Sequence, residues 1–210
     1  MKSASSGTKT GGEDAAGDRT DSQLFASAFG DLGIDPSMLV PWKLRASEVG
    51  ATPLVSSRGA ELLLALWSRD KYMGRLDARA IGRLGSFFTF ATVAAGRDII
   101  RQEEYGNFMI VLLTGSIAVD RRQPWGEQMR MAEARPGDIL GEMSLLDSGM
   151  RFAHCTTLEK CELGVLGAES LDTMMAKDAE LAASLIALLA RKLSLRLRIV
   201  GARVSDLRNP

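Results

Sequence analysis

The chain has 210 residues and a formal net charge of zero, from 26 basic and 26 acidic side chains. A chain of this length can bury about 70% of its unfolded surface, and its balanced charge neither requires nor excludes a nucleic acid partner. The N-terminus lacks the apolar stretch of a secretory signal, and runs such as "ELLLALW" and "SLIALLA" are too short to span a bilayer. We therefore expect a cytoplasmic protein.

The cysteine and histidine content argues against metal chemistry. Cys155 and Cys161 lie six residues apart among apolar residues, and we expect both to pack as small hydrophobic side chains. The single histidine, His154, leaves too few nitrogen and sulfur ligands for a zinc or iron–sulfur site. We expect no metal and no cofactor and, because no nucleophile adjoins a general base, no enzyme activity.

The N-terminal part divides into three segments. Residues 1–22 are polar and small, which predicts a disordered tail. Residues 23–56 contain the apolar patches "LFASAFGDLGI" and "MLVPWKL", so we expect a partly ordered N-terminal arm that docks on the body or on a partner, in preference to a mobile arm. Residues 57–86 predict two helices, over 58–70 and about 77–84, with Asp77 near the start of the second.

The central segment, residues 87–168, has a different pattern of apolar residues and glycines. Short apolar or alternating runs are separated by glycines every eight to twelve residues or so, as in "FFTFATVAAG" and "NFMIVLLTG". "RPGD" at 135–138 predicts a tight turn. This pattern favours a small antiparallel sandwich or jelly roll.

The C-terminal segment, residues 169–208, is predicted to be helical. Its apolar residues step by four and three through a heptad seam, at Ile186, Ala190, Leu193, Leu197, Val200, Val204 and Leu207. We expect this coiled-coil seam to form a homodimer, in preference to lying in a groove. Further apolar residues widen the face toward the protein's own barrel, namely Leu185, Leu188, Leu189, Leu195 and Ile199.

One motif, "DILGEMSLLDSGMRFAHC" at 138–155, carries the functional prediction. Gly141 permits close approach to the backbone, and "EMSLLD" predicts a short helix whose N-terminal amides favour an anion. Arg151 can then bind a phosphate, while Glu142 requires a hydrogen-bond donor such as a ribose hydroxyl. A cyclic nucleotide offers both groups. The alternative is a simple surface ion pair between Glu142 and Arg151.

These residues resemble the cyclic-nucleotide-binding domains of the catabolite activator protein superfamily. The similarity covers about residues 76–207 and includes "VAAGRDIIRQEEYGNFMIVLLTGSIAVDR" and "RPGDILGEMSLLDSGMRFAHC". It implies an α+β fold, an antiparallel β-roll with short helices before it and a long C-terminal dimerisation helix after it.

The resemblance also implies a ligand site for cyclic AMP or cyclic GMP. By matching position, Glu142 accepts the ribose 2′-hydroxyl and Arg151 binds the cyclic phosphate. Residues beside them complete the implied ligand-binding set, namely Gly141, Met143, Ser144, Phe152 and Ala153.

Two residues depart from the pattern of this superfamily. Phe152 stands where a small or hydroxyl residue is common, and Met150 stands where proline is common. The missing hydroxyl would cost about 0.5–1.5 kcal/mol of binding, so we expect poor affinity for cyclic AMP. We expect Phe152 itself to pack in the core.

The output is predicted from the C-terminus. Transcription factors of the superfamily that this chain resembles continue into a winged helix-turn-helix domain, whereas this chain stops at Pro210. We expect a stand-alone sensor that signals through its C-terminal helix to a separate protein partner, with Ser194, Arg196 and Arg198 as a possible lid over the base. Two alternatives are a ligand-free dimeric scaffold and nonspecific binding of nucleic acid by the basic helix.

Overall fold

The computed structural model describes residues 23–71 and 76–206, with side chains placed as far as residue 202. The helices are α1 (Leu24–Asp31), the 3₁₀ helix η1 (Pro36–Met38), α2 (Trp42–Glu48), α3 (Ser56–Trp67), α4 (Ala78–Gly85), α5 (Glu142–Asp147), α6 (Ala168–Lys177) and α7 (Ala179–Asp206). The strands are β1 (Thr52–Pro53), β2 (Thr89–Val93), β3 (Asp98–Ile100), β4 (Phe108–Thr114), β5 (Ile117–Arg122), β6 (Gln128–Ala134), β7 (Ile139–Leu140), β8 (His154–Thr157) and β9 (Cys161–Gly167).

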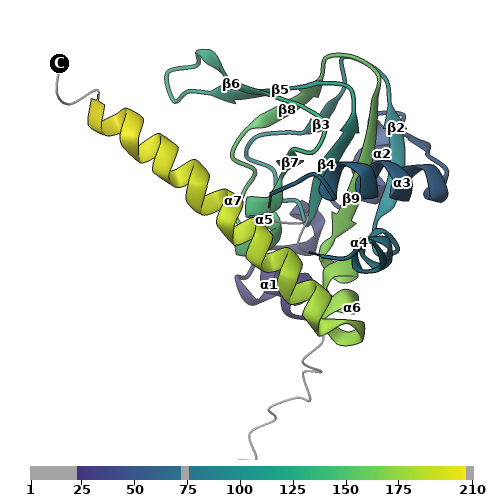
Figure 1. Cartoon of the computed structure of the whole chain (residues 1–210). Coiled ribbons are helices and arrows are strands. Elements are labelled where there is room, and N and C mark those ends of the chain that lie inside the picture. The colour runs from purple at the N-terminus through teal and green to yellow at the C-terminus, as the bar shows by residue number, and fades with distance from the viewer. Residues whose placement is uncertain (1–22, 72–75, 207–210) are drawn as a thin grey trace, which may run out of the picture.

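The strands form two antiparallel sheets. One has the order β1-β2-β9-β4-β7 and the other β3-β8-β5-β6. Helices α3 and α4 pack beside the first sheet, and the long α7 runs along the roll and projects past it (Figure 1). The α+β fold with an antiparallel β-roll that the sequence predicts is therefore confirmed.

Strand β4 explains why the protein has two apolar cores. Successive side chains of a strand point to opposite faces, and both faces of β4 are buried. Phe108, Ile110 and Leu112 pack between the two sheets. Met109, Val111 and Leu113 pack against the helices. The continuous apolar run "FMIVLL" is what a strand covered on both sides requires.

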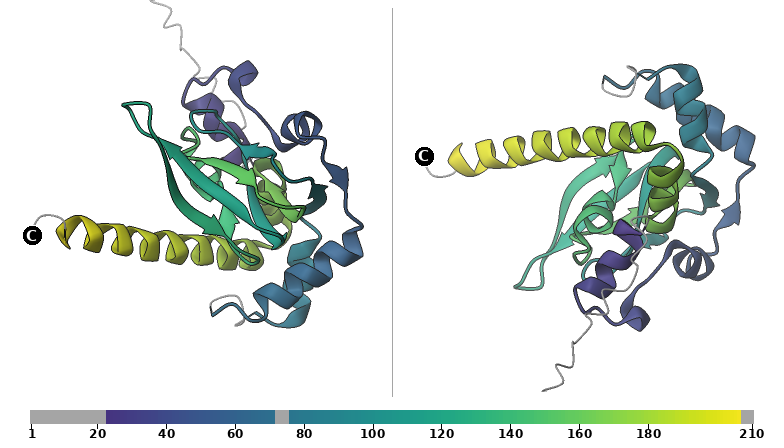
Figure 2. Two further views of the ribbon diagram at one scale, coloured as in Figure 1. Left: turned by 90° about the horizontal axis from the view of Figure 1, so that it is seen from above. Right: turned by 90° about the horizontal axis from the view of Figure 1, so that it is seen from below.

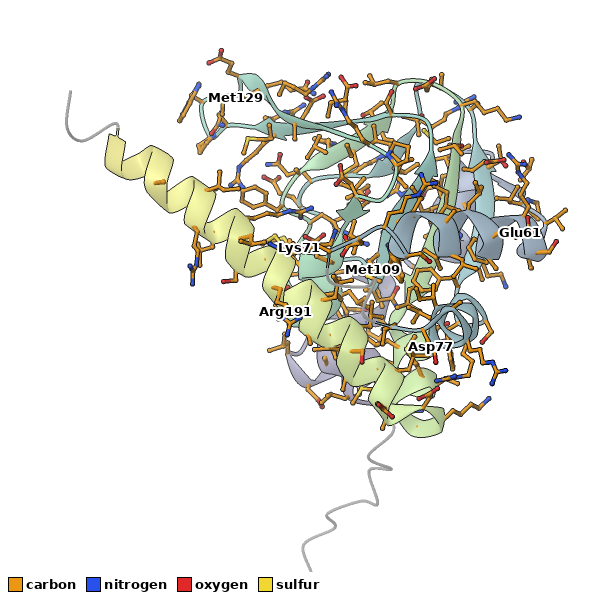
Figure 3. All side chains as sticks on the ribbon, in the orientation of Figure 1. Glu61, Lys71, Asp77, Met109, Met129 and Arg191 are labelled. Atoms are coloured by element: carbon orange, nitrogen blue, oxygen red, sulfur yellow. The ribbon has the colours of Figure 1, made fainter. Side chains whose placement is uncertain are left out.

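The β5–β6 hairpin differs sharply from β4. Its outer strand β6 is exposed at every residue from 128 to 133. Met129 lies out on this hairpin, whereas Met109 lies in the interior (Figure 3). Strand β6 therefore contributes little to either core apart from Ala134, whereas β5 contributes Ile117.

The two helices before the roll begin and end close to their predicted bounds. The first starts at Ser56 and ends at Trp67, so it starts two residues before and ends three residues before the predicted 58–70. In the second, the Asp77 carboxylate accepts a hydrogen bond from the Ala80 amide at 2.6 Å and caps the helix.

The N-terminal arm (residues 23–56) lies on the body of the protein. Asp172 of α6 is 97% buried, and its two oxygens accept hydrogen bonds from the amides of Phe25 and Ala26 at 2.9 and 2.8 Å. A carboxylate at the start of a helix satisfies otherwise free amides. Phe25 and Phe29 of α1 are buried. The predicted tail, residues 1–22, lies outside the described residues.

The buried apolar side chains of α7 lie in its first half, and the second half extends away from the body of the protein (Figure 2). Leu185, Leu188 and Leu189 pack into the helix-side core, as predicted. The prediction that Leu195 and Ile199 also face the barrel is wrong, because they are 43% and 54% exposed. By that point the helix has passed beyond the surface that covers its first half.

The heptad seam is also divided. Ile186 and Leu193 are half-buried against the protein's own chain, whereas Ala190, Leu197 and Val200 are exposed. The side chains of Val204 and Leu207 lie outside the described residues. None of the helices in the described ranges is long and apolar enough to cross a membrane.

Candidate functional site

A small cavity lies where the predicted ligand-binding residues meet. Its volume is about 100 Å³. The roll, the segment around α5 and one side chain of α7 line it, namely Ile100, Val119, Leu140, Gly141, Glu142, Met143, Ser144, Arg151, Phe152, Ala153, Cys155 and Arg196. The structure thus brings together all seven residues of the predicted ligand-binding set.

Gly141 sets the shape of one wall. It follows β7 and precedes α5 with a φ of +75°, in the left-handed region that glycine adopts without strain. A Cβ atom here would lie 2.5 Å from Nη1 of Arg151 and 3.2 Å from the Phe108 carbonyl oxygen. Glycine is therefore required both for the turn and for the space that the guanidinium occupies.

Arg151 is the most deeply placed cation of this cavity. Arg151 is 4% exposed, and its guanidinium donates hydrogen bonds to the carbonyls of Gly141 at 2.7 Å and Phe108 at 2.8 Å. The guanidinium also lies 4.4 Å from the centre of the Phe108 ring. In the described part of the chain, no carboxylate forms an ion pair with it. Burial lowers the pKa of Arg151 from its ordinary value to about 10.

Glu142 begins α5 and is 4% exposed. Its carboxylate pairs with the guanidinium of Arg196 on α7, which also donates to the Ile139 carbonyl at 3.0 Å. Burial raises the pKa of Glu142, and the charge of Arg196 opposes that rise. The alternative of a Glu142–Arg151 ion pair is not what this structure shows, because Glu142 takes its cation from α7.

The three predicted lid residues on α7 are placed differently. Arg196 contacts Glu142 and lines the cavity. Ser194 and Arg198 are exposed and do not line it. Only one of the three therefore lies where it can cover a ligand in this conformation.

Phe152 corrects another expectation. It was expected in the core, but its side chain is 49% exposed at the edge of the cavity, and the Arg121 guanidinium lies 3.8 Å from its ring centre. The residue follows Arg151 directly, so while Arg151 turns inward, Phe152 turns outward. Met150 is exposed as well. The space beside Arg151 is thus left open by Phe152.

The cysteines are both free and buried. Cys155 lines the cavity, and burial raises the pKa of its thiol to about 12. Among the described residues, no group of three or more histidine, cysteine or acidic side chains is placed to hold a metal ion.

Sequence reasoning missed the support around Arg151. Phe108 provides a carbonyl and a ring, and Gly106 passes so close that a Cβ atom there would lie 2.7 Å from Nε of Arg151. The signal was the glycine in "EYGNFM", at the start of the buried strand. A glycine at such a position often marks a close backbone approach.

The chain is similar to known regulatory proteins. The family model described as "Cyclic nucleotide-binding domain" matches residues 90–178. A cyclic AMP receptor protein from Thermus thermophilus is 32% identical over 108 residues, 51% of this chain and 50% of that protein. A CRP-like cAMP-activated global transcriptional regulator from Mycobacterium tuberculosis is 27% identical over 112 residues, 53% of this chain and 48% of that protein.

A structural neighbour agrees on the fold. The cyclic nucleotide-binding domain from Methylobacillus flagellatus has a TM-score of 0.67 at 22% identity, covering 73% of this chain and 87% of the neighbour. The chain spans about half the length of the curated relatives it matches.

Proposed function

The chain contains a cyclic nucleotide-binding domain with homologues in the CRP family, and from this premise we propose that it is a cyclic nucleotide sensor. The observation that carries the proposal is the state of Arg151, a buried guanidinium that donates hydrogen bonds to the neutral carbonyls of Gly141 and Phe108. Burying a cation without an anion is costly. A cyclic phosphate beside Arg151 would supply the missing charge and restore its pKa upward.

Glu142 is proposed to accept the ribose 2′-hydroxyl. It lies in the same cavity as Arg151, and Arg196 contacts its Oε1 atom. Both side chains line this one small cavity, so the two charged groups are near each other. A ligand with a phosphate fused to a ribose matches this pair of groups.

The cavity volume indicates that binding requires movement. It measures about 100 Å³, whereas ligand pockets usually measure roughly 300–1,000 Å³. Among the described residues of α7, Arg196 is the only one that lines the cavity. We propose that the nucleotide separates Arg196 from the roll and shifts the second half of α7, which passes the signal to a protein partner.

Helix α7 is also the proposed dimer surface. Leu195, Leu197, Ile199 and Val200 are between 43% and 73% exposed. Such a run of apolar side chains on one helix is usually covered by another helix. A second copy of α7 would bury the exposed part of the heptad seam, so that movement at Arg196 would reach the dimer interface directly.

Cyclic AMP is the first ligand to test, because the relatives are named for it. The test is calorimetric titration of the full chain with cyclic AMP, cyclic GMP and adenosine 5′-monophosphate as the control. We expect saturable binding of a cyclic nucleotide that Arg151→Met weakens about 100-fold or more, the effect of truncating one partner of a buried charged pair. Equal affinities for the wild type and Arg151→Met would contradict the proposal.

The small cavity also supports a second candidate, a ligand-free dimeric scaffold of the same fold. In that case the Glu142–Arg196 contact would be a permanent part of the core. The scaffold would be favoured over the sensor if no cyclic nucleotide gave heat on titration while the protein sedimented as a folded dimer.

A further inference from the structure

The N-terminal arm is joined to the Arg151 segment through a shared backbone strip. Tyr105 forms a parallel bridge with Leu39 of the arm and an antiparallel bridge with Met150. The Val40 amide donates to the Tyr105 carbonyl at 2.8 Å. On the other side of the same strip, the Arg151 amide donates to the Glu104 carbonyl at 2.8 Å. Residues 103–106 thus lie between the arm and the phosphate-binding candidate.

Side chains repeat this connection. The Trp42 ring of α2 meets the Phe108 ring edge-on, with centroids 5.5 Å apart. The same Phe108 ring lies 4.4 Å from the Arg151 guanidinium, and its carbonyl accepts a hydrogen bond from Arg151 Nη2 at 2.8 Å. The Phe108 ring therefore contacts both Trp42 of the arm and the Arg151 guanidinium, and the Phe108 carbonyl also binds Arg151.

Arg45 adds a charged contact between the arm and the loop. It is 1% exposed and pairs with Glu48 at 2.6 Å and with Glu104. Its Nε atom is buried without a hydrogen-bond partner. The Glu104 carbonyl accepts a hydrogen bond from the Arg151 amide. Arg45 therefore pairs with the same segment that binds the Arg151 backbone.

The loop between them is strained. Glu103 has a φ of +68°, which is unusual for a residue with a side chain. Such conformations persist only where the surroundings hold them. The Glu103 amide donates to the Arg151 carbonyl at 2.9 Å. A loop in this state will relax when its neighbours are removed, and its relaxation would move Arg151.

We propose that Trp42 and Arg45 are positioning residues for Arg151, acting through Phe108 and Glu104. Neither residue lines the cavity. Because coupling between two sites is reciprocal, a nucleotide bound at Arg151 also strengthens the docking of the N-terminal arm. This inference rests on the proposed cyclic nucleotide site, and it names the arm as a second element that the ligand controls.

The first test needs no ligand. Amide hydrogen exchange is measured on the full chain and on Trp42→Ala, Trp42→Phe and Asp172→Asn. We expect exchange at the Arg151 and Glu103 amides to become at least about tenfold faster in Trp42→Ala. Trp42→Phe keeps an aromatic ring against Phe108 and should restore slow exchange. Asp172→Asn weakens the far end of the arm, at α1, and should leave both amides protected.

The second test is nucleotide affinity in the same four proteins and in Arg45→Met. Trp42→Ala and Arg45→Met should bind cyclic AMP about tenfold more weakly, a loss within the usual range of coupling between sites. Trp42→Phe and Asp172→Asn should bind within about twofold of the wild type, a difference too small to indicate coupling. Circular dichroism shows that each variant is folded at the temperature of titration.

The outcomes separate this inference from the proposed function. If the wild type binds but Trp42→Ala binds equally well, the inference is overturned and the sensor stands. If Trp42→Phe is no better than Trp42→Ala, the aromatic contact is not what positions Arg151, and the inference is also overturned. If the wild type binds no nucleotide, the proposed function fails, and hydrogen exchange alone decides whether Trp42 positions Arg151.

Discussion

The two halves of α7 have similar apolar content and opposite surroundings. Leu181, Leu185, Leu188 and Leu189 in the first half are at most 2% exposed. In the second half, Leu195, Leu197, Ile199 and Val200 are 43% to 73% exposed. Arg196 lies in the second half and contacts Glu142. One helix thus begins as part of the core and continues as a largely exposed segment, the part that we propose moves when a nucleotide binds.

The largest expected effect concerns stability. Leu185→Ala removes a fully buried side chain from the first half and should lower the free energy of unfolding by about 2–5 kcal/mol. Leu197→Ala, its matched control in the second half, should change it by no more than about 0.5 kcal/mol. Urea denaturation measures the free energy of unfolding of both variants, at protein concentrations below the dissociation constant of the proposed dimer. Similar losses in the two variants would contradict the division of α7.

The second effect concerns association. Leu197→Glu combined with Val200→Glu places two charges on the exposed seam, and we expect a dimer to become a monomer at micromolar concentration. Ala187→Glu introduces a charge at an exposed position of the first half and should leave the dimer intact. Sedimentation velocity distinguishes the species. A dimer that tolerates the double substitution would place the interface elsewhere.

The third effect concerns ligand affinity. In the present conformation, Arg196 contacts Glu142 and the cavity measures only about 100 Å³. Arg196→Ala removes this contact, so the conformation with the small cavity should become less stable. Because apparent affinity falls with the fraction of protein in a binding-competent form, we expect this variant to bind cyclic AMP several-fold more tightly. Arg198→Ala, whose side chain is exposed and does not line the cavity, is the control. Weaker binding in Arg196→Ala would mean that Arg196 holds the ligand and does not exclude it.

The smallest effect concerns pH. Because burial raises the pKa of Glu142 above its ordinary value, the folded state holds a proton that the unfolded state has lost in the window between the two values. Stability therefore falls as pH rises through that window, the reverse of the usual carboxylate. Glu142→Gln should remove this slope and raise the melting temperature at pH 7 while weakening nucleotide binding. A lower melting temperature would show that the pair with Arg196 outweighs burial.

The sequence was informative where partners are close along the chain. Gly141, Glu142 and Arg151 lie within one short motif, and their types and spacing were enough to place them in one cavity. The cap at Asp77 was similarly local. The apolar run of β4 was recognised as a strand of the roll, and the structure adds that both of its faces are buried.

Specific pairings between distant segments were not predictable, although Arg196 itself was expected near the ligand site. Arg196 and Glu142 are 54 residues apart, and Phe108 and Arg151 are 43 residues apart. The pairing of Asp172 with the start of α1 spans 147 residues. Such contacts depend on how the sheets and helices pack, which periodicity does not specify. Phe152 was misplaced for a local reason, because an aromatic residue next to a buried one can face either the core or the solvent.

The most direct test is a distance measurement across α7. Both native thiols are buried, and the pKa of Cys155 is raised to about 12, so spin labels will attach selectively to introduced cysteines. One pair joins Lys160→Cys on the roll to Arg198→Cys, and the control pair joins Lys160→Cys to Ala183→Cys, with each labelled protein diluted into unlabelled protein. We predict that cyclic AMP changes the first distance and leaves the second unchanged. A first distance that stays the same at saturating nucleotide would contradict the account.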